Sequence, residues 1–193
     1  MLRFTEDEFK AFTASRAAGK KRKKKADPFL ALAPVKEPSP HAVALAALAK
    51  NPDLRKGNQE HFEQVIIFDF FERKHPEIYE LLHATPNGGK RTKATAGKMK
   101  AEGQKKGYPD MSLDMPRGIY HGMRLELKEP GGKGPSPEQI EWMHRLSAQG
   151  YYVVLAYGAE QAITAILEYT NLKPRESIDH VLNEQKWFSL NKK

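Results

Sequence analysis

The segment 151–157 is the part of this sequence that most constrains the fold. Its seven residues, YYVVLAY, are aromatic, β-branched or otherwise apolar, which is typical of a buried strand. A helix is predicted immediately before it, because Ser136 is a good N-cap, Pro137 suits the first helical position and Gly150 suits the end. Another helix is predicted over about 159–169. A buried strand between two helices indicates an α/β protein.

The chain before this segment continues the alternation of helices and strands. A helix is predicted over 58–74 with Asn58 as its N-cap, and Pro76 is expected to stop it. The other predicted elements are a strand over 81–84, a turn over 86–89, a helix over 92–102 closed by Gly103, and strands over 110–114 and 120–128. The complete order predicts an α/β sandwich in which helices flank a central mixed sheet.

We expect one folded domain with a tail at each end. With 193 residues and 39% hydrophobic content, the chain can build one sizeable core and is too short for two comfortable domains. The folded domain is predicted over 51–172, after a basic, largely flexible extension over 1–50 and before an appendix over 173–193. Shorter helices are expected over 5–16 and 41–49 in the extension and around 178–187 in the appendix.

The composition excludes several classes of protein. The chain contains no cysteine, so a disulfide, a zinc ribbon and a thiol nucleophile are excluded, and a reducing cytoplasm suits it. No run approaches eighteen apolar residues, which excludes a membrane-spanning helix. The first residues lack the basic and apolar regions of a signal peptide. We therefore expect a cytoplasmic protein without a membrane partner.

The excess of basic residues indicates a polyanionic partner. Lysine and arginine total 32 against 24 acidic residues, a net charge of +8, which favours nucleic acid first and anionic lipid second. The basic run 20–25 lies in a segment, 17–40, that is predicted to be a flexible tether, either a solubilising tail or an arm that holds a phosphate backbone. A second cluster falls inside the predicted domain and consists of Lys90, Arg91, Lys93, Lys98, Lys100, Lys105 and Lys106.

Three residues with matching chemistry are predicted to meet at one point of the sheet. Glu126 and Lys128 are two residues apart on one strand, so their side chains leave the same face. A hairpin brings Asp110 beside them. The two carboxylates and the carbonyl of Leu127 make an oxygen site suited to Mg²⁺ or Mn²⁺, and Lys128 could orient a water and offset charge on a phosphate. The other interpretation is a solvated strand face with a cross-strand ion pair.

Two further features have both a functional and a structural interpretation. Glu63 shares the apolar stripe of its helix with Ile66 and Phe70, so it either reaches the same cation or lies at the edge of the stripe in water. The turn Asn87-Gly88-Gly89 either supplies residues that tolerate positive φ or presents its amides to a phosphate, with Arg91 beside it.

Taken together, residues 58–170 resemble the VRR-NUC branch of the PD-(D/E)XK nucleases. The matching motifs are Glu63-Gln64, Pro86-Asn87-Gly88-Gly89 with Arg91, Lys106-Gly107-Tyr108-Pro109-Asp110, Arg124-Leu125-Glu126-Leu127-Lys128, Ser136-Pro137-Glu138-Gln139 and Gly150-Tyr151-Tyr152-Val153-Val154. They occur in the order and spacing expected of the family. The resemblance implies a restriction-endonuclease-like core and a Mg²⁺- or Mn²⁺-dependent phosphodiesterase that acts on DNA.

The resemblance also implies roles for individual residues. Asp110 and Glu126 are similar to the family's metal ligands, and Lys128 is similar to its catalytic lysine. Glu63 is similar to the helix-borne acid, and Gln139, which also belongs to a capping box, is similar to an additional polar residue at the site. The residues expected to bind DNA are Asn87, Gly88, Gly89, Lys90, Arg91, Lys93, Lys105 and Lys106.

These features predict a structure-selective DNA endonuclease. Short members of the family resemble viral resolvases of four-way (Holliday) junctions that act as homodimers, so we predict junction resolution in a bacterial cytoplasm, in a phage or prophage setting. The alternatives are a nuclease that processes flaps or nicks and a non-catalytic nucleic-acid-binding module of the same fold. A peripheral membrane protein is disfavoured, because the chain has no amphipathic helix of the required strength.

Overall fold

The structure is a computed structural model that describes residues 37–86, 93–178 and 188–189, together with Asp7, Lys10 and Ala11. Its helices are α2 (Pro40–Lys50), the 3₁₀ helix η2 (Pro52–Arg55), α3 (Gln59–Lys74), α4 (Pro76–Tyr79), α5 (Lys93–Ala101), α6 (Pro137–Ala148) and α7 (Ala159–Thr170). Its strands are β1 (Leu82–Ala84), β2 (Met111–Leu113), β3 (Met123–Lys128), β4 (Tyr152–Tyr157) and β5 (Phe188–Ser189).

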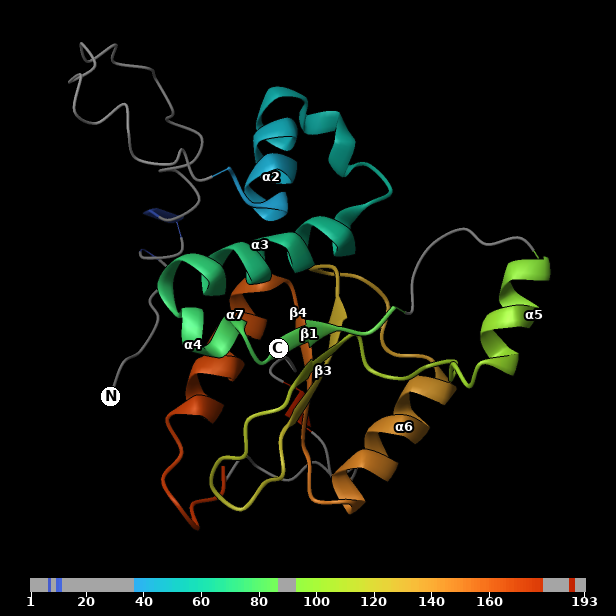
Figure 1. Ribbon diagram of the computed structural model, residues 1–193, viewed down its shortest axis with the longest axis vertical. Helices are drawn as coiled ribbons and strands as arrows, with labels where there is room; N and C mark the ends of the chain where they lie inside the picture. Colours follow the sequence, from blue (N-terminus) through green and yellow to red (C-terminus); the bar gives the residue numbers. More distant parts are fainter. Residues whose placement is uncertain (1–6, 8–9, 12–36, 87–92, 179–187, 190–193) are drawn as a thin grey trace.

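The strands form one mixed sheet in the order β1-β2-β3-β4-β5 (Figure 1). The first three strands pair antiparallel, whereas β3–β4 and β4–β5 are parallel. Parallel neighbours need a crossover connection, and α6 supplies it between β3 and β4. The predicted α/β class, with helices flanking a central mixed sheet, is confirmed.

The side chains of β3 alternate between two layers of the protein. Leu125 and Leu127 belong to the main core, which α3 and α7 cover. The intervening residues, Arg124, Glu126 and Lys128, leave the opposite face, against which α6 packs. The strand therefore carries a row of charged side chains beneath α6 while its other face is fully apolar.

Several predicted local features are confirmed. Helix α2 covers the predicted 41–49, and Gly103 follows α5 with a φ of +94°. Ser136 begins α6, with both hydrogen bonds of the capping box present. Pro76 lies just beyond the end of α3, as predicted, but it also begins the short helix α4, because proline suits the first helical position.

The strand predicted over 120–128 is shorter than expected. It begins only at Met123, because the main-chain N–H of Tyr120 donates to the carbonyl of Arg117 and closes a turn there. Gly118, inside this turn, has a φ of +58°, a value that an extended strand does not contain.

Some predictions concern residues outside the described ranges. These are most of the helix expected over 5–16, the basic run 20–25, most of the tether 17–40, the residues Asn87, Gly88, Gly89, Lys90 and Arg91, and nearly all of the helix expected around 178–187. In the part of the chain that is described, no helix is both long and apolar enough to cross a membrane.

Candidate active site

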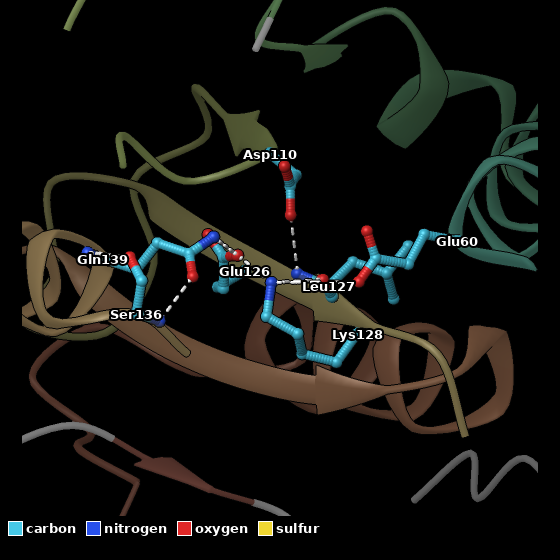
Figure 2. Close-up of polar contacts among 7 residues, drawn as sticks. All are labelled: Glu60, Asp110, Glu126, Leu127, Lys128, Ser136 and Gln139. Carbon is cyan, nitrogen blue, oxygen red and sulfur yellow. Dashed lines mark hydrogen bonds and ion pairs between the residues drawn. The ribbon is translucent and has the colours of Figure 1, made fainter. Parts of the chain in front are cut away.

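The structure brings Asp110, Glu126 and Lys128 together at the junction of β2 and β3 (Figure 2). The main-chain N–H of Leu127 donates to Oδ2 of Asp110 at 3.0 Å. The Nζ atom of Lys128 donates to Oε1 of Glu126 at 2.5 Å. The interpretation of these residues as a solvated strand face is wrong, because Glu126 is completely buried and Lys128 is only 9% exposed.

Glu126 is held in a place that disfavours its charge. Its Oε1 atom accepts hydrogen bonds from Lys128 and from Nε2 of Gln139. Its Oε2 atom is buried and has no hydrogen-bond partner among the described residues. Burial, and then the neighbouring charge of Asp110, raise the pKa of Glu126 to about 8. A buried carboxylate with an unsatisfied oxygen is costly unless a proton or a cation joins it.

The pKa values of Asp110 and Lys128, the two neighbours of Glu126, are both raised, but for different reasons. Burial raises the pKa of Asp110, although the hydrogen bond from Leu127 and the charge of Lys128 oppose the rise. Burial lowers the pKa of Lys128, but the negative charges of Glu126, Glu60 and Asp110 outweigh it, so this pKa lies above its ordinary value. The site therefore combines a persistent ammonium with two carboxyl groups that bind protons more readily than usual.

These residues fit a divalent cation such as Mg²⁺ or Mn²⁺. Such ions prefer carboxylate and carbonyl oxygens, which Asp110, Glu126 and Leu127 supply. The unsatisfied Oε2 of Glu126 and the raised pKa values of both acids are features that a nearby positive charge would remove. The described residues contain no group of three or more His, Asp or Glu side chains placed to hold a metal, so a cation at this site would need the carbonyl oxygen of Leu127 in addition to the two carboxylates. That carbonyl also accepts a hydrogen bond from Lys128 Nζ at 3.2 Å.

Gln139 joins the helix start to the acidic pair. Its Oε1 atom accepts from the main-chain N–H of Ser136 at 2.7 Å, and its own N–H donates to Oγ of Ser136 at 3.3 Å. The amide nitrogen at the end of the same side chain donates to Glu126 (Figure 2). The two interpretations of Gln139, a helix cap and a residue of the site, are therefore compatible, because the start of α6 faces Glu126.

The loop that leads into Asp110 is held between α6 and β3. Gly107 has a φ of +80°, and a Cβ atom there would lie 2.8 Å from the carbonyl carbon of Glu138, so the loop approaches α6 too closely for a side chain. The hydroxyl of Tyr108 accepts a hydrogen bond of 3.3 Å from Nε of Arg124. Both contacts lie within three residues of Asp110 and fix its position.

Glu63 is buried, but it binds other partners. Arg55 pairs with its Oε1 atom, and the main-chain N–H of Ala159 donates to its Oε2 atom at 2.7 Å. Ala159 is the first residue of α7, so Glu63 satisfies one of the free N–H groups at that helix start. The alternative that Glu63 lies in water is wrong, since it is 4% exposed. Neither of its oxygens contacts the three residues of the site.

The acid of α3 that approaches the site is Glu60, which the sequence analysis missed. Its Oε1 atom lies 3.9 Å from Nζ of Lys128 (Figure 2). Glu60 precedes Glu63 by three residues, so both lie on the same side of α3, one turn apart. The sequence indicated that acids recur on one side of this helix. It did not indicate which turn of the helix lies next to the end of β3.

The two acids of α3 predict different effects on stability. We expect Glu63→Ala to lower the free energy of unfolding by about 2 kcal/mol, because it leaves a buried N–H at the start of α7 without an acceptor. We expect Glu60→Ala, the matched control, to change it by no more than about 0.5 kcal/mol, since that side chain is largely exposed. Urea denaturation measures both values. Equal losses in the two variants would contradict the structural role of Glu63.

The predicted DNA-binding residues are only partly described. Lys105 and Lys106 are exposed just before the loop that leads to Asp110, and Lys106 pairs with Glu138 at the start of α6. Lys98 and Lys100 are exposed on α5, which extends away from the sheet (Figure 1). Asn87, Gly88, Gly89, Lys90 and Arg91, and the side chain of Lys93, lie outside the described part.

Comparisons with known proteins agree with this fold. A scan against protein-family models finds no match, and a search of curated proteins finds none. A search of solved structures finds a chain described as "VRR_NUC domain protein". The two chains are 29% identical with a TM-score of 0.55, over 64% of this chain and 97% of the other. This similarity supports the predicted resemblance to VRR-NUC domains and confirms an α/β fold consistent with a restriction-endonuclease-like core.

Proposed function

We propose that this protein is a Mg²⁺- or Mn²⁺-dependent deoxyribonuclease that cuts branched DNA, with the four-way junction as its substrate and a homodimer as its working form. The observation that carries the proposal is the pair of the partly buried Asp110 and the fully buried Glu126, whose Oε2 atom is unsatisfied, beside the ammonium of Lys128. A protein that only bound DNA would gain nothing from two carboxylates at a phosphate. The similarity to a structure named as a VRR_NUC domain protein supports the same class.

Each residue of the site has a separate proposed role in phosphodiester hydrolysis. Asp110, Glu126 and the carbonyl of Leu127 would hold the cation, which supplies Lewis-acid polarisation of a phosphate oxygen and a lower pKa for a bound water. Lys128 places a positive charge where negative charge develops on the phosphate, and its raised pKa keeps it charged at neutral pH. Gln139 fixes the rotamer of Glu126, and Glu60 lies close enough to influence Lys128.

The surroundings of the site suit a nucleic acid. Exposed lysines lie on α5 and in the segment just before Asp110, so the stretch of chain that leads into the site carries positive charge. We propose that these lysines contact the phosphate backbone on either side of the cut. We also propose a homodimer, because two sites related by a two-fold axis would cut opposing strands of a junction symmetrically. A phage or prophage origin and a bacterial cytoplasm remain part of this proposal.

The test compares four labelled DNAs: a four-way junction, a 5′ flap, a nicked duplex and a linear duplex. The full chain is incubated with each in Mg²⁺, in Mn²⁺ and in EDTA, beside Lys128→Ala and the matched control Lys133→Ala, which removes an exposed lysine. We expect paired, symmetric cuts in the junction that disappear in EDTA. We expect Lys128→Ala to cut at least about 100-fold more slowly and the control to cut at the wild-type rate.

Two outcomes would change the proposal. Preferential cutting of the flap or of the nicked duplex, under the same controls, would keep the chemistry and replace the substrate. Binding of every DNA without cutting in either metal would overturn the nuclease and leave a nucleic-acid-binding module of the same fold.

A further inference from the structure

A small pocket lies between α2, α3 and the end of β1, outside the cluster of Asp110, Glu126 and Lys128. Its volume is about 210 Å³. It is lined by two histidines, a glutamine, a phenylalanine and two small aliphatic residues: His41, His61, Gln64, Phe68, Val65 and Ala84. Sites for drug-sized ligands are usually about 300 Å³ or larger, so this pocket suits a single small ring system.

One wall of the pocket is held in place by contacts within the protein. The ring of His41 stacks on Phe68 with a centroid distance of 5.5 Å and an interplanar angle of 22°. Its Nε2 atom lies 3.1 Å from the hydroxyl of Tyr79, which sets the orientation of the ring. Among the described residues, no group hydrogen-bonds to the carboxamide of Gln64. The pocket thus offers a held aromatic wall and one amide with donors and acceptors available.

The pocket is joined to the candidate active site through two main-chain connections. Ala84 is followed by Thr85, whose N–H donates to the carbonyl of Asp110 at 2.7 Å. His61 is preceded by Glu60, whose carboxylate lies 3.9 Å from Nζ of Lys128. Adjacent Cα atoms are about 3.8 Å apart, so the rim of the pocket begins one residue away from groups that touch the site.

We propose that this pocket binds one unpaired nucleobase of the DNA strand that is cut in the neighbouring site. A base is a flat heteroaromatic ring, which aromatic side chains bind by stacking and which amide side chains recognise at its edge. A base inside a duplex is stacked and paired, so only a base released at a branch point or an end can enter. The inference rests on the proposed function, and it supplies a physical reason for a preference for branched DNA.

The test follows the base and the cut separately. Binding is measured with the full chain carrying Asp110→Asn, so that the DNA stays intact, on branched DNAs that carry 2-aminopurine or an abasic residue at successive positions around the branch. We expect the fluorescence of 2-aminopurine to change on binding at one position, and an abasic residue there to weaken binding about fivefold or more. Cutting of the same abasic series is then measured with the wild-type chain.

Matched variants locate the effect in the pocket. Ala84→Leu should fill the pocket, and Gln64→Ala should remove its amide; in the Asp110→Asn background both are expected to abolish the position-specific signal. Ala47→Leu makes the same substitution on the exposed surface of α2 and is expected to keep it. Thermal denaturation checks that all three variants are folded, and Gln64→Ala provides the test if Ala84→Leu is not.

The outcomes separate this inference from the proposed function. If an abasic residue changes the cutting rate at no position, and 2-aminopurine fluorescence changes at no position, the inference that the pocket binds a base is overturned. The proposed nuclease activity is then unaffected. If the pocket variants remove a position-specific signal but the wild-type chain cuts no DNA, base binding in the pocket is supported. The proposed nuclease activity is then overturned. A signal that survives in both pocket variants would place the base elsewhere and overturn the inference.

Discussion

Replacing Asp110 by asparagine is expected to reduce the rate of junction cutting by roughly a thousandfold or more. The side chain keeps its size and can still accept the N–H of Leu127, but it loses the negative charge with which Asp110 would hold the proposed cation. DNA affinity should stay the same or rise slightly, because the change removes one negative charge beside a phosphate. Single-turnover cutting and a binding titration at the same salt concentration measure the two quantities.

The control for this prediction is Asp53→Asn, which makes the same change on an exposed 3₁₀ helix where the carboxylate pairs with Lys56. It should cut at the wild-type rate. If Asp110→Asn cuts within about tenfold of the wild type, Asp110 is not a ligand of a catalytic cation and the proposed arrangement of the site fails. A loss of both cutting and binding would instead indicate that the variant has misfolded, which circular dichroism reveals.

Replacing Glu126 by glutamine is expected to make the metal-free protein more stable at pH 8, by about 2–4 kcal/mol. The pKa of Glu126 is raised in the folded state to about 8 from an ordinary 4.5. Between these values the folded protein holds a proton that the unfolded chain has lost, so the free energy of unfolding falls as the pH rises, by up to about 1.4 kcal/mol per pH unit. Glutamine has no proton to lose, so the variant should show a flatter pH dependence.

Urea denaturation in EDTA between pH 5 and pH 8.5 tests this prediction. The advantage of the variant should be small near pH 5 and should grow as the pH rises, whereas Glu77→Gln, an exposed control, should follow the wild type throughout. If the proposed site binds Mn²⁺ in the folded state, Mn²⁺ should stabilise the wild type and should have little effect on the variant. A wild-type stability that does not fall between pH 5 and pH 8 would contradict the buried, proton-binding state of Glu126.

The sequence was sufficient to predict the grouping of Asp110, Glu126 and Lys128, because that grouping depends on local rules. Side chains two residues apart share a face of a strand, and strands that follow one another in the sequence usually pair with each other. The capping box that contains Gln139 was equally accessible, since it depends on the first turn of its own helix, whereas the place of Gln139 beside Glu126 was implied only by the resemblance to VRR-NUC domains. In each case the geometry follows from residues that are close in the sequence.

The roles of the two acids on α3 could not be derived in the same way. Periodicity places Glu60 and Glu63 on one side of the helix, but only the packing of α3 against β3 and α7 decides which acid faces Lys128 and which meets Ala159. The pocket at His41 was hidden for the same reason, because it depends on how α2 docks on Phe68. These relations are tertiary, so a single sequence without a structure contains no local signal for them.

Gln139 both caps α6 and donates a hydrogen bond to Glu126, so few other residues can replace it. A capping box accepts glutamate as readily as glutamine, so the helix alone would allow either residue. Glutamate would, however, set a third carboxylate against Glu126, where glutamine now donates a hydrogen bond. Alanine or serine would lose both contacts at once. Among proteins that keep this site, we therefore expect glutamine to be retained at the third position of the helix even where the N-cap varies among serine, threonine and aspartate.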